Sequence, residues 1–394
     1  MKQRLNELKK TGVKVAVLGC MAERLKDSLI DSNLADIVVG PDGYRSLPQL
    51  LQAVLIEGED HSINVQLSTE ETYADISPLR QKGISAYVSI MRGCNNMCSF
   101  CVVPFTRGRE RSRPMGSILA EVKALSDQGV KEIWLLGQNV NSYFDKTSEG
   151  PESHLNSPGF SELYRLRQGQ GARFSSLLEE VAKTAPGTRI RFTSPHPKDF
   201  PEPVLRVMKE YGNVCNHIHL PLQSGSDRIL QSMRRYYSQS AYLDLVKQIR
   251  GTIPNVSIST DIISGFCGES EEDHQATLRV VDEVKYEQAF MFMYSMRSKT
   301  HAYNTMKDDV PEDVKQRRLE EVIQLVQKGQ FVRNQEEIGK IYQVLVEGNG
   351  KRGGLTGKTT HNKRVSIQGE ANIGQLVNVK VNKVTSQTLS GEIV

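Results

Sequence analysis

A chain of 394 residues, 38% of them hydrophobic, is long enough for two or three compact domains, which excludes a chain that is disordered throughout. No run of about 18 uncharged apolar residues occurs and the N-terminus lacks the apolar block of a secretory signal, so we expect a soluble protein without a membrane partner. Residues 339–394 hold eight Lys and Arg against three Asp and Glu, while the rest holds 42 against 43, so the net charge of +4 lies in the tail and indicates an anionic partner there.

The N-terminal segment alternates between strand and helix patterns, as in an α/β domain. Apolar runs predict buried parallel strands at 13–18 and 36–39, and helical periodicity is present at 21–33 and 45–57. We assign residues 1–57 to this domain and the polar, aperiodic residues 58–82 to a linker. A parallel sheet usually has more than two strands, so the domain looks incomplete.

Six short apolar segments recur between helix-like segments from residue 83 onward. They are 86–91, 132–136, 189–193, 217–222, 257–263 and 289–295. Six successive strand–helix units are typical of a partial barrel, so we predict an α/β core with an open (β/α)6 barrel over residues 83–331. Residues 145–172 are rich in Gly, Ser and Pro and are expected to form an exposed insertion.

The C-terminal segment has the pattern of a small all-β module. A long helical pattern at 311–338 precedes four apolar segments separated by Gly-containing turns, at 342–348, 364–369, 376–384 and 388–394. We predict a β-barrel of four or five strands over residues 332–394.

Six cysteines, three of them within eight residues, indicate a metal site in a reducing compartment and not a disulfide framework. Cys94, Cys98 and Cys101 form a C-x3-C-x2-C pattern directly after the first core strand, where barrels place their chemistry. Three thiolates suit a four-iron cluster and leave one iron open to a cofactor or substrate. A structural zinc site is the alternative, but the sequence places no fourth Cys or His near residues 94–101.

Polar and basic residues follow other strands of the predicted core. Six lie at strand carboxyl ends and could hydrogen-bond a cofactor, with turn capping as the alternative: Gln138, Asn139, Ser194, Gln223, Ser224 and Asp261. Four arginines follow the cysteines at near-alternating positions and would share one face of an extended segment: Arg107, Arg109, Arg111 and Arg113. They could bind phosphates or a cofactor carboxylate, or form a solvated basic loop.

The segment RGCNNMCSFCVVPFTRGRERSRP (92–114) resembles the signature of radical S-adenosylmethionine enzymes, and its longer context is similar to the MiaB-type methylthiotransferases. These attach a methylthio group to C2 of an isopentenylated adenosine beside the tRNA anticodon. The resemblance spans nearly the whole chain through LLGQNVNSY (135–143), FTSPHP (192–197), HLPLQSGSD (219–227), MRRYYS (233–238) and TDIISGFCGESEED (260–273). It is particularly close to the eukaryotic branch named for association with a cyclin-dependent-kinase regulatory subunit.

The resemblance implies the cofactors and partners. Cys94, Cys98 and Cys101 would be catalytic through a 4Fe–4S cluster, and bound S-adenosylmethionine would yield a 5′-deoxyadenosyl radical after one-electron reduction. Arg234, in MRRYYS, joins the candidates for cofactor binding. The expected partners are a tRNA anticodon loop, a ferredoxin- or flavodoxin-type electron donor and a kinase regulatory subunit. The eukaryotic branch implies a mitochondrial location, although residues 1–5 do not resemble a targeting segment; the cytoplasm is the alternative.

The tail resembles a TRAM module, a small β-barrel that binds RNA in this family. Five basic residues are predicted in its Gly-rich loops: Lys351, Arg352, Lys358, Lys363 and Arg364. With Arg107 and Arg109 they are the candidates for contact with RNA phosphates, and a lysine-rich surface that serves solubility is the alternative.

The chain departs from the family pattern at its N-terminal domain. Family members hold a second 4Fe–4S cluster there through three spaced cysteines, and Cys20 resembles the last of them. The other two would lie upstream of Met1, so the chain resembles an N-terminally shortened form that does not assemble the second cluster and inserts sulfur poorly. Two other functions remain open: methylthiolation of threonylcarbamoyl-adenosine or of a ribosomal aspartate, and a non-catalytic role as an RNA- or kinase-regulator-binding protein.

Overall fold

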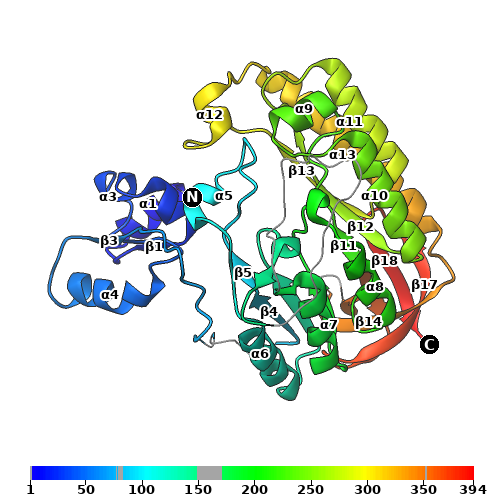
Figure 1. Cartoon of the computed structure of the whole chain (residues 1–394). Helices are drawn as coiled ribbons and strands as arrows, with labels where there is room; N and C mark the ends of the chain where they lie inside the picture. The colour runs from blue at the N-terminus through cyan, green and yellow to red at the C-terminus, as the bar shows by residue number, and fades with distance from the viewer. Residues whose placement is uncertain (1, 77, 79–82, 149–170, 351–352) are drawn as a thin grey trace. The chain divides into compact units, whose positions relative to one another are not determined.

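The computed structural model describes residues 2–76, 78, 83–148, 171–350 and 353–394 (Figure 1). These residues form two compact units. The first comprises the chain up to Tyr73 together with Arg92–Arg111 and Arg297–Asn304, and the second comprises Ala74–Met91, Ser112–Met296 and Thr305–Val394. The cysteine loop thus packs with the N-terminal segment, although the predicted boundaries place it in the core over residues 83–331. A boundary drawn along the sequence cannot represent a unit assembled from three separate stretches.

The first unit contains a three-stranded parallel sheet in the order β1-β2-β3. Its strands are β1 (Ala16–Leu18), β2 (Ile37–Val39) and β3 (Ser62–Asn64), and its helices are α1 (Lys2–Lys10), α2 (Cys20–Leu25), α3 (Ser28–Asp31) and α4 (Leu47–Leu55). β3 corrects the assignment of 58–82 as a linker, because three half-buried residues carry no periodic signal of their own. The helix predicted at 21–33 is broken at Lys26, whose φ of 45° is left-handed.

The second unit contains the predicted barrel as two three-stranded parallel sheets, β10-β7-β4 and β11-β12-β13. The strands are β4 (Ser85–Ser89), β7 (Glu132–Leu136), β10 (Arg189–Phe192), β11 (His217–His219), β12 (Ser257–Ser264) and β13 (Gln288–Met293). All six coincide with predicted segments. A bridge between Ile190 and Val214 links the two sheets, so the strands follow one another around an open barrel.

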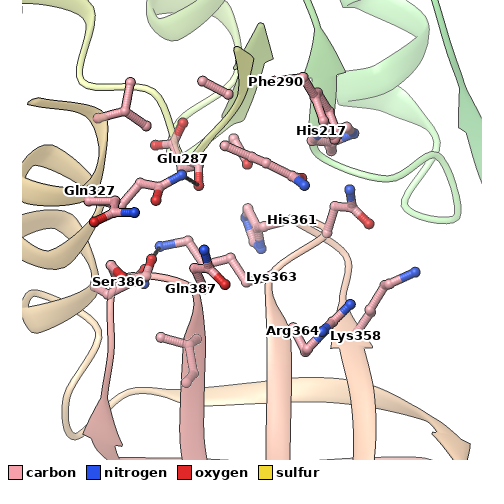
Figure 2. A pocket seen from close by; sticks show the side chains of 18 of the residues that line it. His217, Glu287, Phe290, Gln327, Lys358, His361, Lys363, Arg364, Ser386 and Gln387 are labelled. Atoms are coloured by element: carbon pink, nitrogen blue, oxygen red, sulfur yellow. Dashed lines mark hydrogen bonds between the residues drawn. The ribbon is translucent and has the colours of Figure 1, made fainter. Parts of the chain in front are cut away.

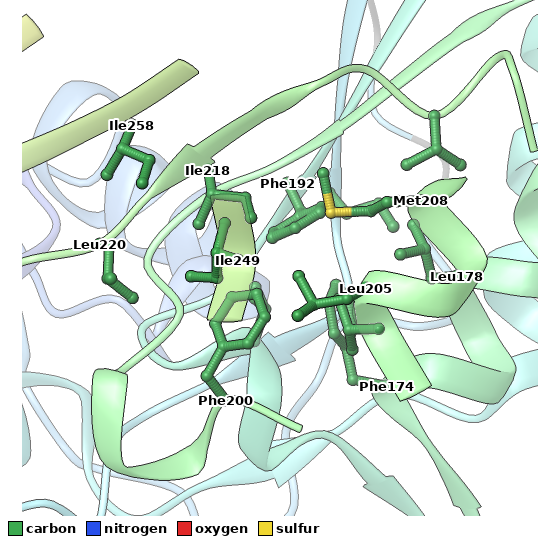
Figure 3. Close-up of a cluster of buried hydrophobic side chains, with 14 of the residues drawn as sticks. Phe174, Leu178, Phe192, Phe200, Leu205, Met208, Ile218, Leu220, Ile249 and Ile258 are labelled. Atoms are coloured by element: carbon green, nitrogen blue, oxygen red, sulfur yellow. The ribbon is translucent and has the colours of Figure 1, made fainter. Parts of the chain in front are cut away.

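Helices cover the outside of this barrel. They are α6 (Met115–Asp127), α7 (Phe174–Thr184), α8 (Glu202–Glu210), α9 (Asp227–Ser232), α10 (Gln239–Thr252), α11 (Glu271–Val284) and α13 (Glu312–Gln335). Figure 3 shows how Phe192 and Ile218 from the strands meet Leu205 and Ile249 from the helices, and all four are buried. Burial of each such side chain stabilises the fold by about 1.5–3 kcal/mol.

The predicted insertion begins and ends in buried structure. β8 (Phe144–Asp145) pairs in antiparallel fashion with β9 (Ala172–Arg173), and Phe144, Asp145 and Ala172 are buried. The ends of the 145–172 assignment were therefore wrong, because two-residue strands are too short to show a pattern. The rest of the insertion, residues 149–170, lies outside the described residues.

The C-terminal module is a closed five-stranded barrel in the order β14-β15-β16-β18-β17. This confirms the predicted β-barrel of four or five strands. Its strands are β14 (Ile341–Asn349), β15 (Leu355–Thr359), β16 (Arg364–Gln368), β17 (Leu376–Val384) and β18 (Thr388–Ile393). The sequence interpretation placed β15 in a loop, because LTGKT lacks apolar alternation. Its edges pair with β14 and β16, and that pairing closes the barrel.

Two arginines of β10 hold this module against the (β/α)6 barrel. Arg191 donates to the carbonyl oxygens of Thr359 (2.6 Å) and Thr360 (3.0 Å) and forms a buried ion pair with Glu132 at 2.6 Å. Arg189 donates to the carbonyl oxygens of Lys358 and Gln343 at 2.8 and 2.9 Å. Within the described residues, no helix has both the length and the apolar character needed to span a bilayer.

Candidate active site

The cysteine loop is closed at its base by backbone and side-chain hydrogen bonds. Gly93 has φ of 76°, and a Cβ there would lie 2.1 Å from the carbonyl oxygen of Arg109, so only glycine fits. The Cys94 amide donates to the Gly108 carbonyl at 3.2 Å. Asn95 and Glu110 exchange three further hydrogen bonds of 3.1–3.2 Å. The segment from 93 to 110 is thus a single closed loop that carries all three thiols.

The three thiols lie close enough to affect one another electrostatically. Burial, and to a smaller extent the charges of Glu110, Cys98 and Cys101, raise the pKa of Cys94 to about 12, although a backbone hydrogen bond from Asn96 acts in the opposite direction. Cys98 is buried, and Cys101 donates its amide to the Cys98 carbonyl at 3.0 Å, so a tight turn joins the last two cysteines. A bound metal ion displaces the proton of a thiol even when the pKa of that thiol is raised. The three thiols can therefore act as thiolate ligands of a metal group.

Cys94, Cys98 and Cys101 are all free thiols. Cysteine thiolates are the ligands of four-iron clusters, so this donor set fits such a cluster.

Cys20 belongs to the same unit as the cysteine loop. It is the first residue of α2, and Arg107 at the end of α5 (Val103–Arg107) donates from Nε to Cys20 Sγ at 3.0 Å. The role of Cys20 as a ligand stays a prediction. The contact shows that Arg107 points to the thiol of α2, which the spacing of the arginines did not reveal.

The prediction that four arginines share one exposed face was wrong. Arg111 pairs with Asp42 at 3.1 Å, and Arg92 pairs with the same buried carboxylate at 3.0 Å. In the second unit, Arg113 pairs with Glu121 at 2.7 Å and is also buried. Arg109 alone is exposed. The segment folds into a short helix and a strand, so alternate residues do not point the same way, and carboxylates elsewhere in the chain pair with two of the four charges.

Three candidates for cofactor binding in the second unit have a left-handed backbone. The φ angles are 58° for Ser194, 67° for Gln223 and 56° for Arg234. Residues other than glycine are uncommon in this region, and such positions cluster at functional sites. A fourth candidate, Gln138, has a buried Oε1 without a hydrogen-bond partner among the described residues. This orphaned acceptor at a strand end fits a hydrogen bond from a bound cofactor.

Asn139 is held in a buried network that the sequence interpretation did not detect. Its Nδ2 donates to Asp199 at 2.7 Å, and its Oδ1 accepts from the His196 amide at 3.0 Å. Lys198 pairs with Asp199 at 2.6 Å, with both side chains almost fully buried. Burial and the charges of Arg235 and Lys198 lower the pKa of His196 well below its usual value, so its ring is neutral. Asn139 thereby joins the loop after β7 to the loop after β10.

The loop that carries Gln223 and Ser224 is supported by Asp273. Ser226 caps α9 and donates a hydrogen bond to Asp273. Asp273 forms a capping box with Ser270 at the start of α11 and also pairs with Arg228. Burial raises the pKa of Asp273, but hydrogen bonds from Arg228, Ser226 and Ser270 have the larger combined effect, so the pKa is lowered to about 2. Asp261 lies 3.3 Å from His219 Nε2. It is inside β12 and pairs in register with Phe290, so its predicted place at the carboxyl end of a strand was wrong.

The substitution Asp273→Asn is expected to destabilise the protein by about 2 kcal/mol at neutral pH, because the carboxylate keeps a depressed pKa only in the folded state. The folded pKa of about 2 is below the ordinary value of 3.8, so this contribution is complete above pH 4 and is lost as the pH falls towards 2. Urea unfolding at pH 7 and pH 3 measures the difference. Asp244→Asn, at an exposed pair with Lys247, is the control and should change stability by less than about 0.5 kcal/mol at either pH. An equal loss at both pH values would contradict the prediction.

The basic candidates of the C-terminal module lie around one cavity, apart from Lys351 and Arg352, which lie outside the described residues. Lys358 is in β15 and Arg364 begins β16, so their placement in Gly-rich loops was wrong. Lys358 pairs with Glu347 at 3.2 Å, and Lys363 pairs with Glu337 at 3.0 Å.

Comparison with known proteins agrees with this geometry. Residues 88–281 match the model of the radical SAM superfamily, and residues 335–394 match that of the TRAM domain. A radical S-adenosylmethionine methyltransferase from Kitasatospora setae, TsrM, solved with tryptophan and a cofactor analogue, has a TM-score of 0.53 at 15% identity, covering 74% of this chain and 57% of that one. The open barrel and cysteine loop therefore define a radical S-adenosylmethionine enzyme with a TRAM module.

Sequence relatives give the family. The chain is 49% identical over 403 residues to the mouse (Mus musculus) mitochondrial tRNA methylthiotransferase CDK5RAP1, covering 97% of this chain and 68% of the relative. It is also 49% identical over 395 residues to the tRNA-2-methylthio-N(6)-dimethylallyladenosine synthase of Chloroherpeton thalassium, covering 99% of this chain and 82% of the relative. The chain belongs to the MiaB-type radical SAM tRNA methylthiotransferase family.

Proposed function

We propose that the protein converts N6-isopentenyladenosine to 2-methylthio-N6-isopentenyladenosine at position 37 of tRNA, in the mitochondrion. The observation that carries this proposal is the closed loop of Cys94, Cys98 and Cys101 in a chain about half identical to relatives named for this chemistry. The mitochondrial location rests on the names of the mammalian relatives.

A 4Fe–4S cluster with S-adenosylmethionine supplies radical chemistry, which suits C2 of adenine because no side-chain acid or base can deprotonate that carbon. The thiols of the cysteine loop hold the cluster. Gln138, Ser194, Gln223, Ser224, Arg234 and Asp261 bind or orient the cofactor. Asn139 positions the loops that carry Gln138 and Ser194 through Asp199 and His196. A tRNA anticodon loop, an electron donor of the ferredoxin or flavodoxin type and a kinase regulatory subunit are the proposed partners.

Nucleosides from cells that lack the gene test this proposal. We expect mass spectrometry of position 37 to show loss of 2-methylthio-N6-isopentenyladenosine and accumulation of its N6-isopentenyl precursor. The control is the same cells with the wild-type gene restored, in which the modified nucleoside should return. If the methylthio group is lost from threonylcarbamoyl-adenosine instead, the protein methylthiolates that nucleoside. Unchanged nucleosides would favour a non-catalytic binding protein.

The 394-residue polypeptide has one cysteine in its N-terminal segment, Cys20, and Arg107 already contacts that thiol. One thiolate cannot hold a four-iron cluster, so we expect residues 1–394 by themselves to hold the cluster of the cysteine loop and to cleave S-adenosylmethionine. Cys215 and Cys267 are both buried in the second unit.

A further inference from the structure

The inner face of the sheet β11-β12-β13 carries a line of polar side chains. His219 of β11 is in register with Ser259 of β12, and Asp261 of β12 is in register with Phe290 of β13. Alternate residues of a strand point to the same face, so His217 lies on this face as well. The neighbours on the opposite face are buried in the hydrophobic core: Ile218, Ile258 and Ile262. The polar side chains therefore face the inside of the barrel.

Four of these side chains form one continuous chain of hydrogen bonds. His217 Nε2 lies 3.0 Å from Ser259 Oγ, and the same oxygen lies 2.9 Å from His219 Nδ1. His219 Nε2 lies 3.3 Å from Asp261 Oδ2. His217 and Ser259 are buried, whereas the Asp261 side chain is 27% exposed. The chain therefore runs from a buried end at His217 to a carboxylate that a bound molecule can reach.

The donors and acceptors fix the direction of this chain. A carboxylate accepts hydrogen bonds, so His219 donates from Nε2 to Asp261. Burial and the nearby charge of Arg191 lower the pKa of His217 well below its usual value, so its ring is neutral and carries a single N–H. The Nδ1 of His217 has no hydrogen-bond partner among the described residues. A buried N–H without a partner is rarer than a buried acceptor without one, so His217 carries its proton on Nε2 and donates to Ser259. The Ser259 hydroxyl then donates to Nδ1 of His219.

Phe290 limits the movement of the His219 ring. The two rings meet edge to face, with their centroids 5.9 Å apart. Figure 2 shows Phe290 and His217 at a cavity of about 540 Å³, which residues of the C-terminal module also line. A ring that is held at both nitrogens and packed against an aromatic side chain keeps one orientation and one tautomer. His219 therefore presents a fixed N–H to Asp261.

We propose that His219 is a positioning residue, which holds Oδ2 of Asp261 and so presents the other carboxylate oxygen to a ribose hydroxyl of S-adenosylmethionine. The inference rests on the proposed function, in which Asp261 binds the cofactor. Asp261 lies beside a second cofactor candidate, because the Gln223 amide donates to the Asp261 carbonyl at 2.8 Å. A ribose offers hydroxyl donors, and acidic side chains accept from such hydroxyls in other nucleotide sites. Ser259 and His217 support the same carboxylate through His219.

Reductive cleavage of S-adenosylmethionine by the cluster-loaded full chain, followed against cofactor concentration, tests this role. We expect His219→Leu to raise KM for the cofactor by about tenfold with kcat within about twofold of wild type, because one hydrogen bond to a charged group is lost. His219→Gln keeps an N–H near the place of Nε2 and should restore KM to within about threefold of wild type. Asp261→Asn should also raise KM, and adding His219→Leu to it should raise KM no further, because His219 acts through this carboxylate.

His274→Leu is the matched control. His274 is also a buried histidine that contacts a carboxylate, Glu321 at 2.7 Å, but it lies on α11 outside the barrel. This variant should leave KM for the cofactor unchanged. An unchanged KM in His219→Leu, effects that multiply in the double variant, or a rise in KM for tRNA alone would contradict the inference. Absence of 5′-deoxyadenosine from the wild-type chain would instead contradict the proposed function.

NMR of the histidine nitrogens gives a readout that does not depend on activity. In the wild-type chain labelled with nitrogen-15 at histidine, we expect the proton on Nε2 in both His217 and His219. Each signal is assigned by its loss in His217→Leu or His219→Leu. A proton on Nδ1 of His217 would mean that the hydrogen bonds run in the opposite direction, and this result would overturn the inference even if His219→Leu fails to fold.

Discussion

Replacing Cys98 with alanine is expected to abolish reductive cleavage of S-adenosylmethionine and to remove the cluster. After anaerobic reconstitution, the wild-type polypeptide should contain about four iron and four sulfide per chain, and Cys98→Ala should contain less than one of each. Two thiolates cannot hold a four-iron cluster, so the formation of 5′-deoxyadenosine should fall by at least about 10³-fold, to background. Iron analysis and chromatography of the nucleoside product measure the two effects.

Cys267→Ala is the matched control for this experiment, because Cys267 is a buried cysteine outside the cysteine loop. It should retain the wild-type iron content and product yield. Zinc in place of iron in the wild-type protein, or full iron in Cys98→Ala, would contradict the assignment of the loop. About eight iron per wild-type chain would contradict the expectation that this polypeptide holds a single cluster.

Replacing Arg191 with methionine should produce the largest loss of stability, about 3–5 kcal/mol. Burial raises the pKa of Glu132, but the charge and hydrogen bond of Arg191 outweigh it, so the pKa is lowered and the buried carboxylate is charged. Methionine would leave this charge without its partner and would also remove the hydrogen bonds to the carbonyl oxygens of Thr359 and Thr360. Urea unfolding followed by circular dichroism gives the free energy of unfolding.

The control for this substitution is Arg317→Met, which removes an arginine paired with Glu271 and Glu321 on the exposed face of α13. Exposed ion pairs contribute little, so the expected loss is below about 1 kcal/mol. The double variant Arg191→Met with Glu132→Leu removes both charges and should regain part of the lost stability. Similar losses for Arg191→Met and Arg317→Met would show that the contact between β10 and the TRAM module does not stabilise the fold.

Much of the second unit could be predicted because its signals are local. Six apolar segments coincide with the six barrel strands, and α13 lies within the helical pattern predicted at 311–338. Short strands with few apolar residues could not be predicted in this way. β3 and β15 exist because neighbouring strands supply hydrogen-bond partners that the segments themselves do not reveal: Ser62 pairs with Ile37, and Lys358 pairs with Leu345 and Arg364.

The sequence by itself indicated the ligand set of the cysteine loop, because the number of residues between Cys94, Cys98 and Cys101 is fixed by the chain and does not depend on the rest of the fold. It also determined the order of the modules. Only the tertiary structure decided how the charges are paired: Arg111 shares Asp42 with Arg92, Arg113 pairs with Glu121, and Arg364 lines a cavity. Asp42 is brought to Arg92 and Arg111 by folding across 50 and 69 positions, and no local pattern encodes such contacts.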